Sequence, residues 1–390
     1  MDFVLTSKQQ ELQKRAYSAG LEFKELAFKW DEEDRVDYRP VSDRMGALGL
    51  LGLTVPREYG GQGGDCMDYL IVCSEATRAA ATWVVGEPPF CTTGPGPSML
   101  MLSESKVLKE KYLQDVVTGR RGCAIALSEP DHGSDLTHLE TSAYLDGDAY
   151  VVSGDKSFVT GALYNDLYAT FVRFDGIPGP RGIGALLIES DYPGFSMSRG
   201  PEFVGTRGIP HGDVKLEKVR VPKENLIIGP GEFPRLMTAF NMERLHNASL
   251  ALGTMMAAYD EAAAYVQQRH VFGRPVIEFQ AVYHALADIA LTIEAARLLC
   301  FKAAATAIDG RYPRLQEITM AKIFAGTHAP QVTMKCLELM GGMGVTKKTA
   351  TQRLHREAIT NLVAGGAPAV LKNSIAATLF PDRKFSQTRG

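Results

Sequence analysis

The sequence has little of several features that mark common classes of protein. Its six cysteines are spread singly through 390 residues, and they form no Cys-x-x-Cys pair and no compact cluster with histidine. A structural zinc site of the usual spacing and a disulfide framework are therefore excluded, and we expect reduced thiols. No apolar run approaches the roughly 18 residues of a membrane helix, and the first residues do not read as a secretory signal. We expect a cytoplasmic protein without membrane association.

An excess of charge of either sign is also lacking. Lysine plus arginine number 42 and aspartate plus glutamate 45, which gives a net charge of −3 and no reason to expect nucleic acid as a partner. The glycine cluster at 60–64 lacks the lysine of a phosphate-binding loop, and no Gly-x-Ser-x-Gly motif is present. We interpret the cluster as an ordinary turn and exclude a serine hydrolase.

The sequence does contain a clear succession of helical and strand-like patterns. Helical spacing of apolar residues behind a Thr/Ser cap predicts a helix over 6–30, and further helical patterns with Gly/Pro punctuation follow. From Gly122 the pattern changes to short alternating runs, and alanine-rich helical patterns return after GPGEFP. We therefore predict an α+β protein with a helical N-terminal domain, a central β domain and a C-terminal four-helix-type domain, at 1–121, 122–230 and 231–390.

Four separated segments point to a family. They are SEPDHGSD (128–135), GDKSFVTG (154–161), RHVFGRPVIEFQ (269–280) and ELMGGMGV (338–345). In this order and spacing they resemble the acyl-CoA dehydrogenase family, whose members carry a T/S-E-P-x-x-G-S-D loop, a K-x-W/F-I/V-T strand, an R-x-x-F-G segment with a later Gln, and an L-G-G-x-G turn. The resemblance extends over nearly the whole chain and agrees with the order helix, sheet, helix.

The resemblance implies FAD as the cofactor, held between the β domain and the C-terminal helices. On the β domain it assigns FAD contacts to Ile125, Leu127, Ser128, Ser134, Phe158 and Thr160. Three more residues would reach the FAD of a neighbouring subunit, namely Arg269, Phe272 and Gln280, and guanidinium geometry suits phosphate oxygens. Further contacts fall on Glu338, Gly341, Gly342 and Gly366. A shared site implies an oligomer, and the family suggests a homotetramer.

The chemistry of such enzymes needs one carboxylate base to remove the α-proton of a thioester while hydride leaves Cβ. In many members the base lies in a C-terminal Y-E-G-T-S segment, but this chain has VAGGAPAV (363–370), which puts Ala364 there. Isovaleryl-CoA and long-chain acyl-CoA dehydrogenases instead place a Glu before an Arg on a C-domain helix. FNMERL (240–245) has this pattern, so the resemblance implies Glu243 as the base, and Glu87 in GEPPF is a second candidate.

The remaining assignments concern the substrate. By resemblance, Phe240, Asn241 and Arg244 would meet the pantetheine or nucleotide part of CoA, Ser134 would lie on the substrate side, and the backbone N–H of Ala364 would bind the thioester carbonyl. We expect desolvation to raise the pKa of Glu243. His132, which replaces a small residue near the flavin, is interpreted as a loop histidine bonded to backbone.

The leading hypothesis is therefore an FAD-dependent acyl-CoA dehydrogenase that passes electrons to an electron-transfer flavoprotein. Two enzyme alternatives stay open: an enoyl-CoA reductase of the crotonobetainyl-CoA reductase type, and a flavin-containing relative of the same fold with other chemistry, such as a desulfinase. A flavin- or CoA-binding scaffold without catalysis is the alternative from a different class. The acyl preference cannot be derived from these motifs.

Overall fold

The computed structural model describes residues 4–383 and 385. Its N-terminal part is helical, and the first helix begins at a capping box in which the Thr6 hydroxyl and the Gln9 side chain each accept the other's backbone N–H. The helices are α1 Ser7–Leu21, α2 Leu26–Glu33, α3 Arg39–Ala47, η1 Arg57–Tyr59, α4 Cys66–Ala80, α5 Trp83–Gly86, α6 Pro88–Thr93, α7 Pro95–Leu100 and α8 Lys106–Val117.

The single helix predicted over 6–30 is wrong at its centre, because the chain turns at 22–25 between α1 and α2. Gly20 lies so close to α4 that a Cβ there would be 2.5 Å from the Ala76 carbonyl oxygen. Past this contact, the turn buries Phe23, and its ring lies 6.1 Å from that of Trp30. Burial of the turn in the tertiary structure therefore ends α1 at Leu21, although local helix propensity alone would continue the helix.

The central part is a twisted sheet with the strand order β6-β7-β3-β2-β4-β5-β8, and β1 pairs in parallel with β4. Most neighbours are antiparallel, as in β3 with β7 and β4 with β5. The strands are β1 Cys123–Ala126, β2 Ser142–Asp146, β3 Ala149–Thr160, β4 Leu167–Phe174, β5 Ile183–Glu189, β6 Phe195–Arg199, β7 His211–Pro222 and β8 Leu226–Ile228, with short turns of 3-10 helix at Leu136–His138, Gly179–Gly182 and Lys223–Asn225.

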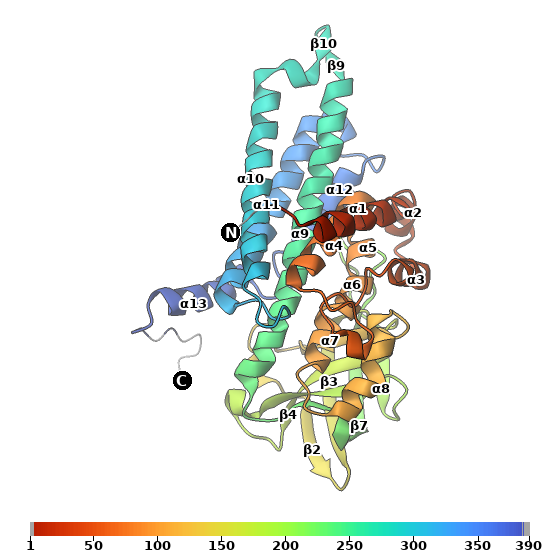
Figure 1. The fold of residues 1–390 in the computed structure, drawn as a ribbon, viewed down its shortest axis with the longest axis vertical. Helices are drawn as coiled ribbons and strands as arrows, with labels where there is room; N and C mark the ends of the chain where they lie inside the picture. Colours follow the sequence, from red (N-terminus) through yellow and green to blue (C-terminus); the bar gives the residue numbers. More distant parts are fainter. Residues whose placement is uncertain (1–3, 384, 386–390) are drawn as a thin grey trace.

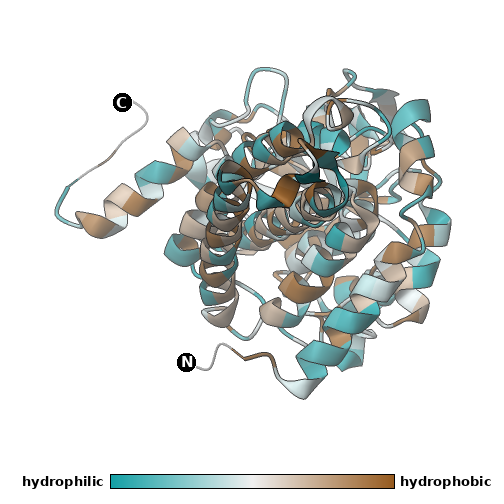
Figure 2. Ribbon diagram, turned by 90° about the horizontal axis from the view of Figure 1, so that it is seen from above, coloured by the Kyte–Doolittle hydropathy of each residue, from teal (hydrophilic) through white to brown (hydrophobic). Residues whose placement is uncertain are grey.

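The C-terminal part is a bundle built around one long helix, α9 Phe233–Gln268. It leads from the sheet to a protruding hairpin of β9 His270–Val271 and β10 Arg274–Pro275 (Figure 1). The other elements are η5 Val276–Glu278, α10 Gln280–Ala305, α11 Leu315–Met340, η6 Gly341–Met343, α12 Ala350–Thr360 and α13 Pro368–Leu379. Helix α13 stands away from the bundle in both ribbon views (Figures 1 and 2).

Helix α9 joins the parts of the molecule because it contributes to two hydrophobic cores. One core packs α1, α4 and α5 against α9 to α12, and the other packs α7 and α8 against β1, β4, β5 and the first turns of α9. The first turns of α9 therefore lie where the N-terminal helices, the sheet and the bundle meet, and this is where the candidate base Glu243 lies. Within the described residues, no helix has both the length and the hydropathy of a membrane span.

Candidate active site

Glu243 lies on α9 in a mostly buried setting, although part of its side chain remains accessible. Asn247, one turn further on, donates from Nδ2 to the Glu243 carboxylate Oε1 at 2.9 Å and to its main-chain carbonyl at 2.9 Å. The two side chains share a helix face, as the i, i+4 spacing predicts. Asn247 therefore fixes the direction in which the carboxylate points.

The surroundings of Glu243 raise its pKa above the usual value. Burial is the largest cause, and the Glu87 carboxylate adds to it, while His246, the Asn247 hydrogen bond and Arg244 act in the opposite direction. The result has the direction expected for a carboxylate that must take a proton from carbon.

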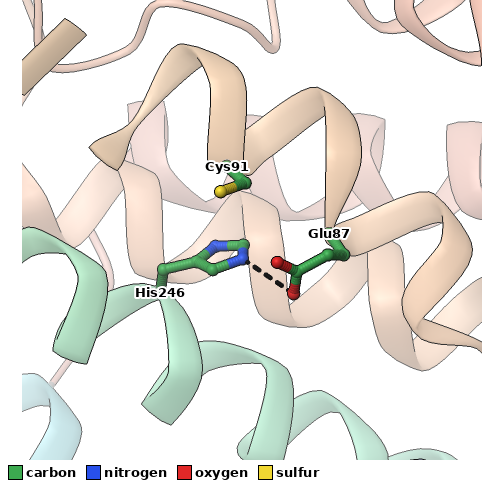
Figure 3. A group of neighbouring side chains, drawn as sticks. All are labelled: Glu87, Cys91 and His246. Carbon is green, nitrogen blue, oxygen red and sulfur yellow. Dashed lines mark hydrogen bonds and ion pairs between the residues drawn. The ribbon is translucent and has the colours of Figure 1, made fainter. Parts of the chain in front are cut away.

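A second acid, Glu87, lies beside Glu243 and is paired with a histidine of α9. Its Oε2 lies 3.2 Å from His246 Nε2, as Figure 3 shows, and His246 Nδ1 lies 2.8 Å from the Tyr69 hydroxyl. Tyr69 also donates to the Phe90 carbonyl at 3.0 Å. This network joins α9 to α4 and to the α5–α6 segment. Helical spacing puts His246 near the Glu243 face of α9, but its partners Glu87 and Tyr69 lie 159 and 177 residues away in the chain.

Arg244 is buried, and its Nη1 contacts the Asn241 side chain oxygen at 2.5 Å. Asn241 in turn donates to the Pro313 carbonyl at 3.0 Å, and the guanidinium lies 5.4 Å from the centre of the Phe240 ring. Burial lowers the pKa of Arg244 to about 10, although Glu243 opposes this. The three predicted CoA contacts are thus neighbours, and Arg244 Nε has no hydrogen-bond partner among the described residues.

The turn at 361–366, which replaces the usual base segment, lies against the same face of α9. A Cβ on Gly365 would be 2.9 Å from Asn247 Nδ2, and Gly365 has a positive φ of 68°. The backbone N–H of Ala364, predicted to bind the thioester carbonyl, instead donates to the Thr360 carbonyl at 3.0 Å because the chain continues the α12 turn there. The N–H of Gly365 has no acceptor within the described part of the chain.

Lys322 of α11 holds this turn in place and was not found from the sequence. Its Nζ donates to the Gly366 carbonyl at 2.7 Å and to the Asn361 carbonyl at 3.2 Å. Burial and the nearby Arg244 charge lower its pKa to about 8, against the opposing effect of Glu243. The signal that could have revealed it is a lone cation in the apolar helical stretch ITMAKIFAG.

On the sheet, Glu129 of the SEPDHGSD motif and Lys156 of the GDKSFVTG motif form a buried ion pair. Lys156 Nζ lies 2.7 Å from Glu129 Oε1 and donates to the Leu127 carbonyl at 3.1 Å, and Glu129 also accepts the backbone N–H groups of Glu140 and Thr141. Burial lowers the pKa of Lys156 to about 8, with Glu129 opposing it. Burial also acts to raise the pKa of Glu129, but the Lys156 charge and the hydrogen bonds outweigh it. This pair ties the SEP loop to β3.

The predicted FAD contacts on the β domain are brought together by this arrangement. Ser157 donates its backbone N–H to the Ser128 carbonyl at 2.9 Å, which joins the loop carrying Leu127 and Ser128 to the strand carrying Phe158 and Thr160. Ile125 lies on β1, and Ser134 is exposed in the following loop. His132 exchanges main-chain hydrogen bonds with Glu129, and its ring Nε2 lies 3.7 Å from Glu140 Oε1.

Phe158 has an unusual conformation and position. It has a positive φ of 56° at a register shift between β3 and β7, and 56% of its surface is exposed. Left-handed backbone in a bulky residue costs free energy and is concentrated at functional sites. The ring borders a cavity of about 570 Å³, which Ser157 also lines, and the buried Ser157 hydroxyl has no partner among the described residues.

The other predicted FAD contacts lie far from Glu243. Arg269, Phe272 and Gln280 lie at the hairpin beyond α9, where all three are exposed, and Phe272 is 95% exposed. Arg269 is 26 residues beyond Glu243, which corresponds to roughly 39 Å along a straight helix. Glu338, Gly341 and Gly342 end α11 near the same end of the bundle (Figure 1), and Glu338 pairs with Lys335 at 2.9 Å. Gly366, by contrast, lies in the turn near Glu243.

Comparisons with known proteins agree with this architecture. Three family models match in succession: the acyl-CoA dehydrogenase N-terminal domain at residues 6–120, the middle domain at 124–219 and the C-terminal domain at 233–380. The three-part α+β fold predicted from the sequence is confirmed.

Relatives and solved structures cover nearly the whole chain. The short-chain specific acyl-CoA dehydrogenase of Clostridium acetobutylicum is 33% identical over 382 residues, which covers 97% of this chain and 100% of the relative. The CarC subunit of the caffeyl-CoA reductase-Etf complex of Acetobacterium woodii is 33% identical, with coverage of 87% and 89%. The butyryl-CoA dehydrogenase structure from Megasphaera elsdenii superposes with a TM-score of 0.93 at 28% identity, over 97% of this chain and 100% of that one. The chain therefore belongs to the acyl-CoA dehydrogenase family, whose members are FAD-dependent oxidoreductases that act on the CH–CH bond of acyl-CoA thioesters.

Proposed function

We propose that the protein oxidises an acyl-CoA thioester to its α,β-enoyl form, with Glu243 as the base. The observation that carries this proposal is the setting of Glu243, a carboxylate with a raised pKa, held by Asn247 where the three domains meet. FAD, when bound, supplies the acceptor for the hydride that leaves Cβ. The Glu243 carboxylate takes the α-proton, so the thioester gains a double bond and Glu243 becomes protonated.

The residues of the β domain fit a flavin. Phe158 offers an exposed ring in a strained conformation, and Ser157 offers a buried hydroxyl that needs a partner. We propose that these strand residues, with Ile125, Leu127, Ser128, Ser134 and Thr160, hold FAD on one side, while Gly366 contributes backbone. The hydrogen bond from Ser157 to Ser128 holds these two segments of the β domain together.

We propose that a second subunit completes this site. Arg269, Phe272, Gln280, Glu338, Gly341 and Gly342 lie too far from Glu243 to serve the same site, since the helix separates Arg269 from it by roughly 39 Å. Their exposure at one end of the bundle fits a role in the FAD site of a neighbouring copy, within a homotetramer.

The thioester end would be held by the turn at 361–366. The Ala364 N–H can bind the thioester carbonyl only after it leaves the Thr360 carbonyl, whereas the Gly365 N–H already lacks an acceptor in the described chain. Phe240, Asn241 and Arg244 are proposed to lie toward CoA, with the unpartnered Arg244 Nε as the group that gains a hydrogen bond. A polarised carbonyl acidifies the α-proton that Glu243 must remove.

Electrons would leave through an electron-transfer flavoprotein in the cytoplasm. The caffeyl-CoA reductase relative, which is 33% identical, is a subunit of a complex with such a flavoprotein, and this supports the same class of electron acceptor here. The reverse reaction uses the same residues, because a protonated Glu243 could return a proton to the α-carbon of an enoyl thioester.

Anaerobic titration of the purified, FAD-loaded protein with a panel of acyl-CoAs tests the proposal. Loss of the oxidised flavin band with one member of the panel is the expected result. If every saturated acyl-CoA leaves the band unchanged, while chemically reduced flavin is reoxidised by an enoyl-CoA, the physiological direction is reduction. If neither thioester exchanges electrons with the flavin, the redox function is wrong.

A further inference from the structure

The wall of the site next to Glu243 is polar, although it lies within a hydrophobic core. Glu87 follows α5 directly and precedes α6, and its carboxylate points at α9, where it meets His246 (Figure 3). His246 is three residues beyond Glu243, so it lies roughly 4.5 Å further along the helix axis. Through His246, Glu87 therefore meets α9 about one helical turn beyond Glu243.

The hydrogen bonds accommodate a His246 that carries a proton on both ring nitrogens. Tyr69 has one hydroxyl proton and the Phe90 carbonyl as its acceptor, so the Tyr69 oxygen can accept from His246 Nδ1. His246 Nε2 then donates to Glu87, and every donor in the chain of bonds has an acceptor. Burial alone would lower the pKa of His246, but Glu87 and Cys73 outweigh it and raise the value well above normal. This direction favours a protonated His246, which would offset the charge of the Glu87 carboxylate 3.2 Å away.

These side chains differ in how much of their surface remains accessible to solvent. His246 is fully buried and Tyr69 is 1% exposed, whereas Glu87 and Cys91 each keep 8% and Glu243 is exposed further. Glu87, Cys91 and Glu243 are thus the members of this group that keep some accessible surface, and His246 has none. Among the described residues none donates to the other Glu87 oxygen, Oε1, which Figure 3 shows turned toward the side of Cys91.

We propose that Glu87 is a specificity residue, whose Oε1 accepts a hydrogen bond from a neutral donor such as a hydroxyl at the far end of a short acyl group. This inference rests on the proposed function, because it assumes that the acyl chain extends from Glu243 toward Glu87. The substrate class is then an acyl-CoA with a distal hydroxyl or phenol.

The charges of the wall favour a neutral donor over other acyl ends. An unsubstituted alkyl end would strip water from a carboxylate oxygen and leave it unpaired, which is unfavourable. A terminal carboxylate would face both Glu87 and Glu243, and like charges repel at this range. A terminal ammonium would add a charge to a wall where His246 already neutralises Glu87. A hydroxyl supplies one donor and no charge.

The same three side chains are less suited to a metal ion. Ligand atoms of Glu87, Cys91 and His246 lie within 4.8 Å of one another. His246 Nε2 is already bonded to Glu87, however, and burial raises the pKa of the Cys91 thiol well above normal, which disfavours the thiolate that binds metals.

Matched thioesters test the proposal. The FAD-loaded enzyme is titrated with acyl-CoAs of one chain length that end in methyl, hydroxyl or carboxylate, and both kcat/KM and Kd by calorimetry are measured. We expect the hydroxyl end to be preferred over methyl by about 10- to 100-fold, the effect of one unpaired buried oxygen, and the carboxylate end to be rejected. A preference for methyl in both measurements would overturn the proposal.

Substitution locates the preference. In Glu87→Met/His246→Leu both members of the pair are removed, so no buried charge remains, and we expect the methyl-ended thioester to become the better ligand. Glu75→Gln, a buried acid of α4 paired with Gln13 and Arg78, is the matched control and should keep the hydroxyl preference. Equal loss of both ligands in the double variant would contradict the inference.

Calorimetry measures Kd independently of the reaction rate, so the proposed reaction and the proposed specificity of Glu87 can fail separately. If no thioester reduces the flavin but the hydroxyl preference in Kd is present and depends on Glu87, the proposed reaction is wrong and the specificity assignment stands. If flavin is reduced equally by methyl- and hydroxyl-ended thioesters, the reaction stands and the specificity assignment falls.

Discussion

Asn247 holds Glu243 by two hydrogen bonds from a single amide nitrogen, one to the carboxylate and one to the main-chain carbonyl, each 2.9 Å long. The second bond fixes the amide against the helix itself, so the first one sets the carboxylate direction relative to α9. Gly365 lies close to the same nitrogen, since a Cβ added there would be 2.9 Å from it, so the amide also links the 361–366 turn to Glu243.

Replacing Glu243 by Gln removes the proton acceptor but keeps the shape and the hydrogen bond acceptor toward Asn247. We expect flavin reduction by acyl-CoA to slow by about 10²- to 10⁴-fold, the usual contribution of a positioned base. Stopped-flow absorbance at the oxidised flavin band measures this rate. The Kd for acyl-CoA should change little, and a variant that reduces flavin at the normal rate would remove Glu243 from the mechanism.

The rate of flavin reduction should depend on pH through Glu243. Only the ionised carboxylate accepts a proton, and burial raises its pKa, so the rate should rise with pH on a limb above the ordinary Glu value of about 4.3. Glu87 raises the pKa of Glu243 further, and His246, Asn247 and Arg244 lower it. Lys322, Tyr69 and Cys91 are the other titratable groups that interact with Glu243.

Asn247→Leu removes a hydrogen bond to the charged form, so the limb should move to higher pH. Pre-steady-state pH profiles of the two proteins measure the shift. Ser249→Ala is the control on the same helix, because its hydroxyl bonds only the Leu245 carbonyl. A limb that stays in place in Asn247→Leu would show that the amide does not tune the base.

Gly365→Ala should impair the reaction through contact. A Cβ there would lie 2.9 Å from Asn247 Nδ2, so the amide must leave its place beside Glu243. Gly176→Ala is the matched control, since Gly176 has a similar φ of 65° but open space around a Cβ. Both variants should lose about 1–2 kcal/mol of stability from left-handed strain, and only Gly365→Ala should slow flavin reduction. Equal activity of the two variants would contradict the contact argument.

The Glu129–Lys156 pair should matter for stability. Lys156→Met leaves a buried carboxylate with only two backbone donors, and breaking such a pair costs about 3–5 kcal/mol in the free energy of unfolding. Urea unfolding measures this. Glu129→Gln/Lys156→Met should recover much of the loss because no charge remains buried.

The same pair predicts a pH effect in the unaltered protein. Since the folded state lowers the pKa of Glu129, its stabilisation is present above the unfolded value of about 4.3 and is lost as pH falls through the lowered value. In the urea experiment, a Glu129→Gln/Lys156→Met protein no more stable than Lys156→Met would show that the unpaired Glu129 charge is not the source of the lost stability.

Arg269→Ala should release FAD without unfolding the subunit. Its side chain is exposed at the hairpin in one chain, so its loss removes little from the fold. We expect a lower ratio of bound flavin to protein by absorbance at an unchanged melting temperature of the apoprotein. Arg274→Ala is the control on the same hairpin, where the guanidinium stacks on Phe279 at 4.1 Å. Full flavin content in Arg269→Ala would remove the hairpin from the cofactor site.

Motifs and local patterns predicted the family, the order of helical and sheet segments, and Glu243 as the candidate base, because these depend on short-range spacing. They did not predict what long-range packing decides. Glu87 and His246 are 159 residues apart and meet only in the fold. The break after α1 comes from burial of Phe23, and the Ala364 N–H is occupied because the backbone continues a helical turn. The contacts of Glu129, Lys156 and Lys322 likewise depend on long-range packing, which the sequence patterns do not show.

The length of α9 between Glu243 and Arg269 has a consequence for how this chain can change over time. Each residue of a helix adds a rotation of about 100° and a rise of about 1.5 Å. One inserted or deleted residue between these positions would turn the hairpin to another side of the bundle and aim Arg269 away from any neighbour. In the proposed arrangement, in which Arg269 serves the FAD site of a neighbouring copy, two sites in two subunits would lose their register at once. Point substitutions are therefore the tolerated route of change in this segment, and its residue count should stay constant among proteins that share this arrangement.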